Sequence, residues 1–195
     1  MRIFVFLLSL FFVGQVMAFS PSDLRSIGKG VPAKLYVFTS LACTHCSGFH
    51  KKILPTLKEK YADSGKAQII LVDMVRGENN LIATQIVRCL GMGKSAQLED
   101  VLYTHQSEWA FKEPEEGKKN ILSYAKQHGM TQAQFNRCVS DKELRETILD
   151  QQENLARLYG ITGTPTLVMR DGSEVHKWVG PDETVFEELK EAFQK

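Results

Sequence analysis

Two cysteines separated by two residues, in the stretch Cys43-Thr44-His45-Cys46, are the part of this sequence best suited to chemistry. Thiols at this spacing can form a disulfide between them and exchange it with the thiols of another protein. We expect Cys43 to be the exposed sulfur that takes part in the exchange, and Cys46 to be the buried sulfur that resolves it. The sequence therefore predicts a redox-active dithiol.

The elements around this dithiol place Cys43 at the beginning of a helix, after an apolar strand over residues 34–39 and a turn over residues 40–42. The first backbone N–H groups of a helix lack partners and make that end electropositive, so they stabilise a thiolate. His45 can add a positive charge or an N–H donor. A fall in the pKa of Cys43 from about 8.5 to about 5 would favour the reduced form by about 4 kcal/mol, or roughly 90 mV. These residues therefore indicate an oxidant.

The hydrophobic pattern predicts an α/β fold that is interrupted by a helical insertion. Apolar runs at 34–39 and 68–75 predict two parallel strands, joined by a helix that is either kinked or interrupted near Pro55. Residues 166–179 predict a hairpin, and Pro181 the start of a terminal helix. The expected divisions are a leader over 1–18, a first α/β part over 19–76, a helical insertion over 77–159 and a second α/β part over 160–195.

The insertion is expected to contain several short helices with polar loops between them. The acidic and basic run over residues 115–119 is expected to be one of these loops. Two Ser/Thr–x–x–Glu/Gln pairs predict capping boxes at helix starts. The helices are expected at 80–90, at 95–106, at 120–128, after Thr131 with Gln134, and after Ser140 with Glu143.

Residues 1–18 have the organisation of a cleaved secretory leader. Arg2 precedes an apolar run over residues 3–13, Gly14 ends the run, and Val16-Met17-Ala18 fits a cleavage site. The alternative is an uncleaved anchor, for which the apolar run is short. Export would place the mature chain in an oxidising compartment, where disulfides persist.

Pro165 lies in the loop Gly163-Thr164-Pro165-Thr166, directly before the predicted hairpin. The order of strand, dithiol helix, parallel strand, hairpin and terminal helix resembles the thioredoxin fold, which places a cis-proline beside its dithiol at this point. The backbone of Thr164 could then pair with an extended substrate by strand addition. An ordinary trans turn at Pro165 is the alternative.

Together, these features resemble the DsbA family of bacterial thiol–disulfide oxidoreductases over nearly all of the mature chain. The resemblance implies a periplasmic monomer without cofactors that oxidises reduced, exported proteins and is re-oxidised by a DsbB-like membrane protein. Thr164 stands where this family usually has valine and is more typical of isomerases, so a disulfide isomerase or reductase is the alternative. Val37 and His50 replace two acids typical of the fold or family, which leaves the proton acceptor for Cys46 unassigned.

Cys89 and Cys138 remain, and each follows an arginine near the end of a predicted helix. In an exported protein we expect them to form a structural disulfide that stabilises the insertion by roughly 3–4 kcal/mol. Two free, buried thiols are the alternative.

Charge and cysteine spacing argue against other functions. The chain has 24 Lys and Arg against 23 Asp and Glu and shows no basic stripe, which argues against a nucleic-acid partner. A zinc site needs four ligands, and no second cysteine pair has metal spacing, so no metal is expected. A metal carrier or a chaperone without turnover remains the alternative from another class. The other histidines and the tryptophans are expected to have structural roles.

Overall fold

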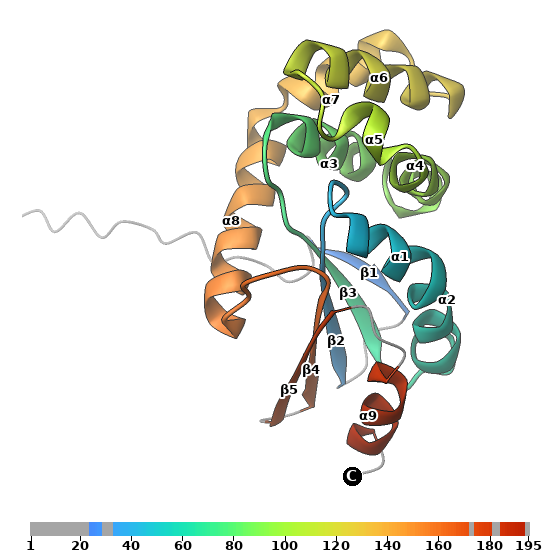
Figure 1. Ribbon diagram of the computed structural model, residues 1–195, viewed down its shortest axis with the longest axis vertical. Helices are drawn as coiled ribbons and strands as arrows, with labels where there is room; N and C mark the ends of the chain where they lie inside the picture. The colour runs from blue at the N-terminus through green and yellow to red at the C-terminus, as the bar shows by residue number, and fades with distance from the viewer. Residues whose placement is uncertain (1–23, 29–32, 172–173, 181–183, 194–195) are drawn as a thin grey trace, which may run out of the picture.

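The computed structural model describes residues 24–28, 33–171, 174–180 and 184–193, and within them the strands form one sheet of five in the order β1-β3-β2-β4-β5 (Figure 1). β2 (Lys34–Thr39) and β3 (Gln68–Asp73) are parallel, whereas β4 (Thr166–Asp171) and β5 (Glu174–Val179) add as an antiparallel hairpin. The predicted α/β class is therefore confirmed. The leader predicted for residues 1–18 lies outside the described residues.

A short strand that the sequence analysis did not predict, β1 (Arg25–Ile27), pairs antiparallel with β3. Arg25 lies inside the protein, where its guanidinium contacts Asp73 at 2.6 Å and Glu99 at 2.5 Å. Two carboxylates from distant parts of the chain thus compensate for the burial of this charge, and local sequence contains no sign of that pairing.

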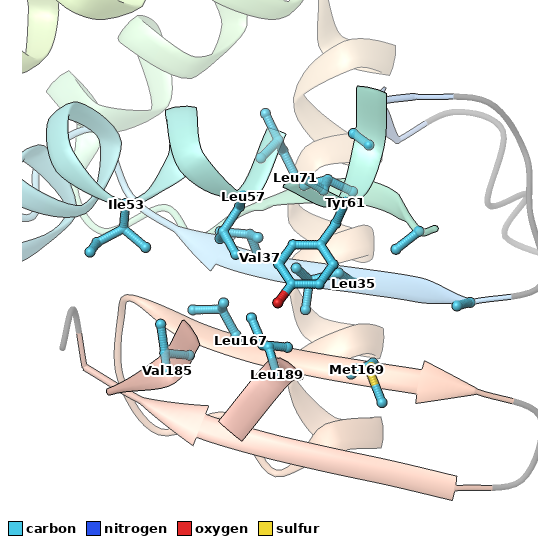
Figure 2. Close-up of a cluster of buried hydrophobic side chains, with 14 of the residues drawn as sticks. Leu35, Val37, Ile53, Leu57, Tyr61, Leu71, Leu167, Met169, Val185 and Leu189 are labelled. Atoms are coloured by element: carbon cyan, nitrogen blue, oxygen red, sulfur yellow. The ribbon is translucent and has the colours of Figure 1, made fainter. Parts of the chain in front are cut away.

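Helices cover both faces of the sheet, which explains why β2 and β3 appear in the sequence as continuous apolar runs. One face packs against α1 (Thr44–Lys52), α2 (Leu54–Leu57), a π-helix (Lys58–Asp63) and α9 (Val185–Ala192). Figure 2 shows this core. Its labelled side chains are Leu35, Val37, Ile53, Leu57, Tyr61, Leu71, Leu167, Met169, Val185 and Leu189.

The other face of the sheet is covered by α8 (Lys142–Tyr159). Leu155 of α8 packs with Tyr36, Phe38 and Val168 of the sheet, and Tyr159 lies against the same cluster. The last helix of the predicted insertion therefore belongs to the sheet core as much as to the insertion. Figure 1 shows it running along the sheet toward the other inserted helices.

Near Pro55 the structure has the interruption rather than the kink. α1 ends at Lys52, and Pro55 lies in the first turn of α2. Proline is tolerated in a first turn because its missing N–H would have no intrahelical partner there. The consequence is a short first helix, which carries the dithiol at its beginning.

The inserted helices gather at one end of the molecule and share a separate hydrophobic core (Figure 1). This core includes the fully buried side chains of Ile86, Leu98, Leu102 and Trp109, and it also contains Cys46. The redox site thus lies where the two cores meet. Besides α8, the inserted helices are α3 (Glu78–Leu90), α4 (Met92–Thr104), α5 (Gln106–Trp109), α6 (Pro114–Gln127) and α7 (Gln132–Ser140).

Several predicted boundaries of these helices need correction. Residues 115–119, expected to be a loop, form the start of α6, because Pro114 occupies a first-turn position and acids follow it. Ser140 and Glu143 do not cap α8, since the side chain of Asp141 accepts from the N–H of Leu144 instead. The capping box of Thr131 with Gln134 is confirmed. Pro181 lies outside the described residues, and the described part of the terminal helix begins at Val185.

Cys89 and Cys138 form a disulfide with a Cα–Cα distance of 5.9 Å. It links the end of α3 to α7. Gln85, one turn earlier on α3, donates to the carbonyl oxygens of Cys138 and Asp141 at 3.2 Å each. The covalent link is therefore reinforced by hydrogen bonds between the same elements.

We predict that the double substitution Cys89→Ser with Cys138→Ser lowers the free energy of unfolding by about 4 kcal/mol, because the cross-link restricts a long loop in the unfolded chain. The two bonded residues are 49 apart in sequence. Urea unfolding of both proteins, with Cys43 and Cys46 in the same redox state, measures the difference. An unchanged midpoint and slope would contradict this prediction.

Candidate active site

Cys43 is the N-cap residue of α1, one position before the predicted helix start. Its N–H donates to the carbonyl oxygen of Ser40 at 3.0 Å, and its own carbonyl accepts from the N–H of Ser47 at 3.1 Å. Cys43 is partly exposed, whereas Cys46, on the first turn, is completely buried. Both are free thiols, so the structure describes the dithiol form of the site.

The two sulfurs have opposite electrostatic environments. The pKa of Cys43 falls to about 5, mainly because the Cys46 thiol hydrogen-bonds to it, and burial opposes this fall. The Thr164 hydroxyl and the backbone N–H groups of Cys46 and His45 lower this pKa further. The pKa of Cys46 is raised far above its ordinary value, because it shares its proton with Cys43 and is buried. One sulfur is thus a thiolate and the other a thiol at neutral pH.

The largest cause of the low pKa therefore differs from the one predicted. The prediction relied on the electropositive helix end, and the backbone N–H groups of α1 do contribute. The neighbouring thiol is nevertheless the stronger donor. His45 lies exposed on the first turn and contributes its backbone N–H, and a role for its imidazole stays a prediction.

The loop with Pro165 lies beside the dithiol. The peptide bond between Thr164 and Pro165 is cis, and the carbonyl oxygen of Thr164 lies 3.4 Å from the Cys43 sulfur. The Thr164 hydroxyl hydrogen-bonds to both Cys43 and Cys46 and stabilises the charged form of each. The structure thus brings Cys43, Cys46, Thr164 and Pro165 together at one site.

Two inserted helices hold the turn before the dithiol, and the sequence analysis identified neither contact. Gln106 of α5 donates to the carbonyl oxygens of Leu41 at 2.6 Å and of Cys43 at 3.0 Å. Asn80 of α3 donates to the hydroxyl of Ser40 at 2.9 Å. These amides fix the backbone on which Cys43 sits, so the insertion takes part in positioning the reactive sulfur.

A buried polar group below Cys46 was also missed. The hydroxyls of Thr39 and Tyr103 are 3.0 Å apart, and Thr39 also hydrogen-bonds to Cys46. Burial, and after it the charge of Cys46, raises the pKa of Tyr103 well above its ordinary value. Glu99 and Arg25 also act electrostatically on Tyr103. Local sequence gives no signal for this group, because Thr39 and Tyr103 are 64 residues apart and meet only in the folded chain.

His50 belongs to α1, and its side chain contacts α4. Its Nε2 is 2.7 Å from a carboxylate oxygen of Asp100, and its ring lies 4.6 Å, centre to centre, from that of Tyr103. Ser47, one turn before, donates its hydroxyl to the carbonyl of Tyr103 at 3.1 Å. These contacts attach the dithiol helix to the insertion.

The described residues contain no group of three or more His, Cys, Asp or Glu side chains that could hold a metal ion. Within the same parts of the chain, every helix is too short or too polar to cross a bilayer.

Known proteins share this architecture. A family model described as thioredoxin matches residues 26–191. Two relatives are provisionally named protein-disulfide oxidoreductases. One, from Rickettsia bellii (strain RML369-C), is 25% identical over 130 residues, and the other, from Rickettsia typhi (strain ATCC VR-144 / Wilmington), is 23% identical over 130 residues. The match covers 66% of this chain but only 49% and 47% of theirs, so the chain spans about half the length of these relatives.

Solved structures of DsbA proteins have the same fold. Wolbachia pipientis alpha-DsbA1 gives a TM-score of 0.76 at 23% identity, over 87% of this chain and 90% of that one. Chlamydia trachomatis DsbA gives 0.67 at 17% identity, over 88% and 90%. These similarities confirm the predicted thioredoxin fold with a helical insertion and the resemblance to DsbA proteins.

We predict that Thr164→Val raises the pKa of Cys43 by roughly 1 unit, because the partly exposed Cys43 thiolate loses its hydrogen bond from the Thr164 hydroxyl. The ultraviolet absorbance of the thiolate, followed against pH, measures the shift. Thr164→Ser is the matched control, since it keeps the hydroxyl and should keep the low pKa. An equally low pKa in the valine variant would show that the hydroxyl does not act on Cys43.

The same shift predicts how stability depends on pH. The pKa of Cys43 is about 5 in the folded dithiol form and about 8.5 in an unfolded chain. Between these values the unfolded state binds more protons, so the free energy of unfolding rises with pH, and the gain is lost as pH falls through 5. Above about 8.5 the unfolded chain loses the Cys46 thiol proton, whereas the folded protein keeps it because the pKa of Cys46 is raised. This difference opposes any further rise in the free energy of unfolding with pH.

Urea unfolding of the dithiol and disulfide forms, compared at several pH values across this range, measures the effect. As pH rises across this range, the free energy of unfolding of the dithiol form should increase relative to that of the disulfide form. A difference that stays constant with pH would contradict the assignment of the thiolate to Cys43.

Proposed function

This chain belongs to the thioredoxin family, and from that premise we propose that it is a protein thiol–disulfide oxidoreductase that donates its Cys43–Cys46 disulfide to other proteins. The observation that carries the proposal is the pairing of a partly exposed Cys43, with a pKa of about 5, and a buried Cys46 that stays protonated. A stabilised thiolate favours the reduced form of the protein, and a protein that prefers its reduced form is an oxidant.

The proposed exchange proceeds in two displacements. A substrate thiolate attacks the Cys43 sulfur, the Cys43–Cys46 bond breaks, and Cys46 leaves and takes up a proton. A second substrate thiolate then attacks the substrate sulfur of the mixed disulfide and releases Cys43 as a thiolate. Two electrons pass from the substrate to the protein, the substrate gains one disulfide, and Cys43 leaves readily because its pKa is low.

We further propose that the substrates are reduced, exported proteins in the periplasm and that a DsbB-like membrane protein re-oxidises the dithiol. The leader predicted over residues 1–18 supports export. The Cys89–Cys138 bond supports an oxidising compartment, because structural disulfides persist there. Action as a monomer is part of the same proposal and follows from the resemblance to DsbA proteins.

A disulfide isomerase or reductase is the second candidate, and Thr164 is the observation that favours it. Its hydroxyl stabilises the charged form of Cys46 as well as that of Cys43. A readier Cys46 thiolate would help the protein to resolve mixed disulfides, which isomerases and reductases require. An oxidase acts faster on a reduced substrate, whereas an isomerase acts faster on a substrate with incorrect disulfides.

We predict that the oxidised protein introduces disulfides into a reduced, unfolded ribonuclease faster than it rearranges a scrambled one, because Cys43 is the better leaving group. Alkylation of free thiols, followed by mass measurement, counts the disulfides formed. Cys43→Ser and Cys46→Ser should each reduce the rate to that without protein, and equilibrium with glutathione should give a potential above the value of about −270 mV typical of thioredoxin. Faster rearrangement than oxidation would reverse the assignment.

A further inference from the structure

A groove of about 420 Å³ opens beside the reactive sulfur and is lined by Cys43 itself, by Thr164 and Ile161, and by Met74, Arg76 and Phe111. It thus joins the dithiol, the cis-proline loop, the end of β3 and the segment between α5 and α6. Its volume is within the range of ordinary ligand sites. A segment whose cysteine reaches Cys43 would therefore place its neighbouring residues in this groove.

Arg76 is the only lysine, arginine, aspartate or glutamate among the described residues that line the groove, and in the disulfide form Cys43 carries no charge. Its side chain is exposed and follows β3, on the connection to α3. The nearest basic residue to Phe111 in the sequence, Lys112, forms an ion pair with Glu116 at 3.4 Å instead. An arginine guanidinium binds a carboxylate through paired hydrogen bonds, so Arg76 favours an acidic group in the groove.

Phe111 adds an apolar surface at the same place. Its side chain is 70% exposed, which is unusual for a large aromatic residue. The backbone on both sides of it is fixed, because the amide of Asn79 donates to the carbonyls of Trp109 at 2.9 Å and of Lys112 at 2.8 Å. Asn79 is itself enclosed, since a Cβ at Gly117 would lie 2.2 Å from its Nδ2. Phe111 is thus exposed on a fixed loop.

We propose that this groove selects substrate segments that carry an acidic side chain close to the reacting cysteine, bound by Arg76, and an apolar side chain packed on Phe111. The proposal rests on the oxidoreductase function proposed above and names its preferred substrate class. Arg76 and Phe111 are the specificity-determining residues, and neither takes part in the exchange of electrons. The bound segment is extended and belongs to the protein that is being oxidised.

The test uses three dithiol peptides that share an apolar residue and differ only in one side chain near the first cysteine, which is Glu, Gln or Lys. We measure kcat/KM for their oxidation by the full chain in its disulfide form. The ratio of kcat/KM for the Glu peptide to kcat/KM for the Lys peptide should be about 2- to 5-fold higher for the unsubstituted protein than for the Arg76→Gln variant. This is the size of effect expected for one exposed ion pair. Comparison with the variant removes the effect of the charge on the peptide's own thiols.

Control variants separate charge from packing. Arg76→Lys should keep most of the preference, and added salt should reduce it, because the pair is exposed. Arg137→Gln removes the same charge from an exposed position on α7 and should leave the ratio between peptides unchanged. Phe111→Ala should slow all three peptides by a similar factor and leave their ratio unaltered.

The possible failures are distinct. If Arg76→Gln gives the same ratio between peptides as the unsubstituted protein, the groove does not select acidic segments and the inference is wrong, although the oxidase function stands. If reduced ribonuclease and all three peptides remain unoxidised, the proposed function itself fails. If ribonuclease alone is oxidised, the groove does not take short segments and the inference is again wrong.

Discussion

The hydrogen bond that the Cys46 thiol makes with the Cys43 sulfur is the interaction on which the rest of the site depends. It is the largest cause of the low pKa of Cys43, and it exists only while Cys46 keeps its proton. The same hydrogen bond with Cys43 and, after it, burial keep that proton in place, because a charge on Cys46 would lie without solvent in an apolar core. The core of the inserted helices supplies this burial, so the insertion contributes to the difference between two chemically identical side chains.

The reactive turn is held from three directions, through its backbone carbonyls, through the Ser40 hydroxyl and at the Cys43 sulfur itself. Gln106 holds the carbonyls of Leu41 and Cys43, Asn80 holds Ser40, and the loop of Thr164 closes the remaining side. A turn fixed in this way directs its N–H groups at the thiolate before any substrate arrives. The sheet contributes the strand and the cis-proline loop, whereas the inserted helices contribute the amides.

Local pattern predicted what depends on neighbours in sequence. The dithiol at a helix start and most elements follow from residue types and spacing alone, whereas the place of Pro165 beside the dithiol was implied by the resemblance to the thioredoxin fold. Strand β1, the contact of Gln106 with the turn, and the group of Arg25, Asp73 and Glu99 could not be predicted in this way. Each depends on partners that only the folded chain brings together, and a buried arginine is indistinguishable in sequence from an exposed one.

The pairing of the strands has a consequence for the order in which the protein assembles. β2 lies at the middle of the sheet, yet one of its neighbours, β4, is encoded near the end of the chain, and Arg25 on β1 is completed by Glu99 of an inserted helix. During synthesis from the N-terminus, neither partner exists when the first strands emerge, so these strands stay incomplete until late. In that interval Cys43 and Cys46 lack the surroundings that distinguish them, and the low pKa of Cys43 is established only after the Thr164 loop and the last hairpin have docked.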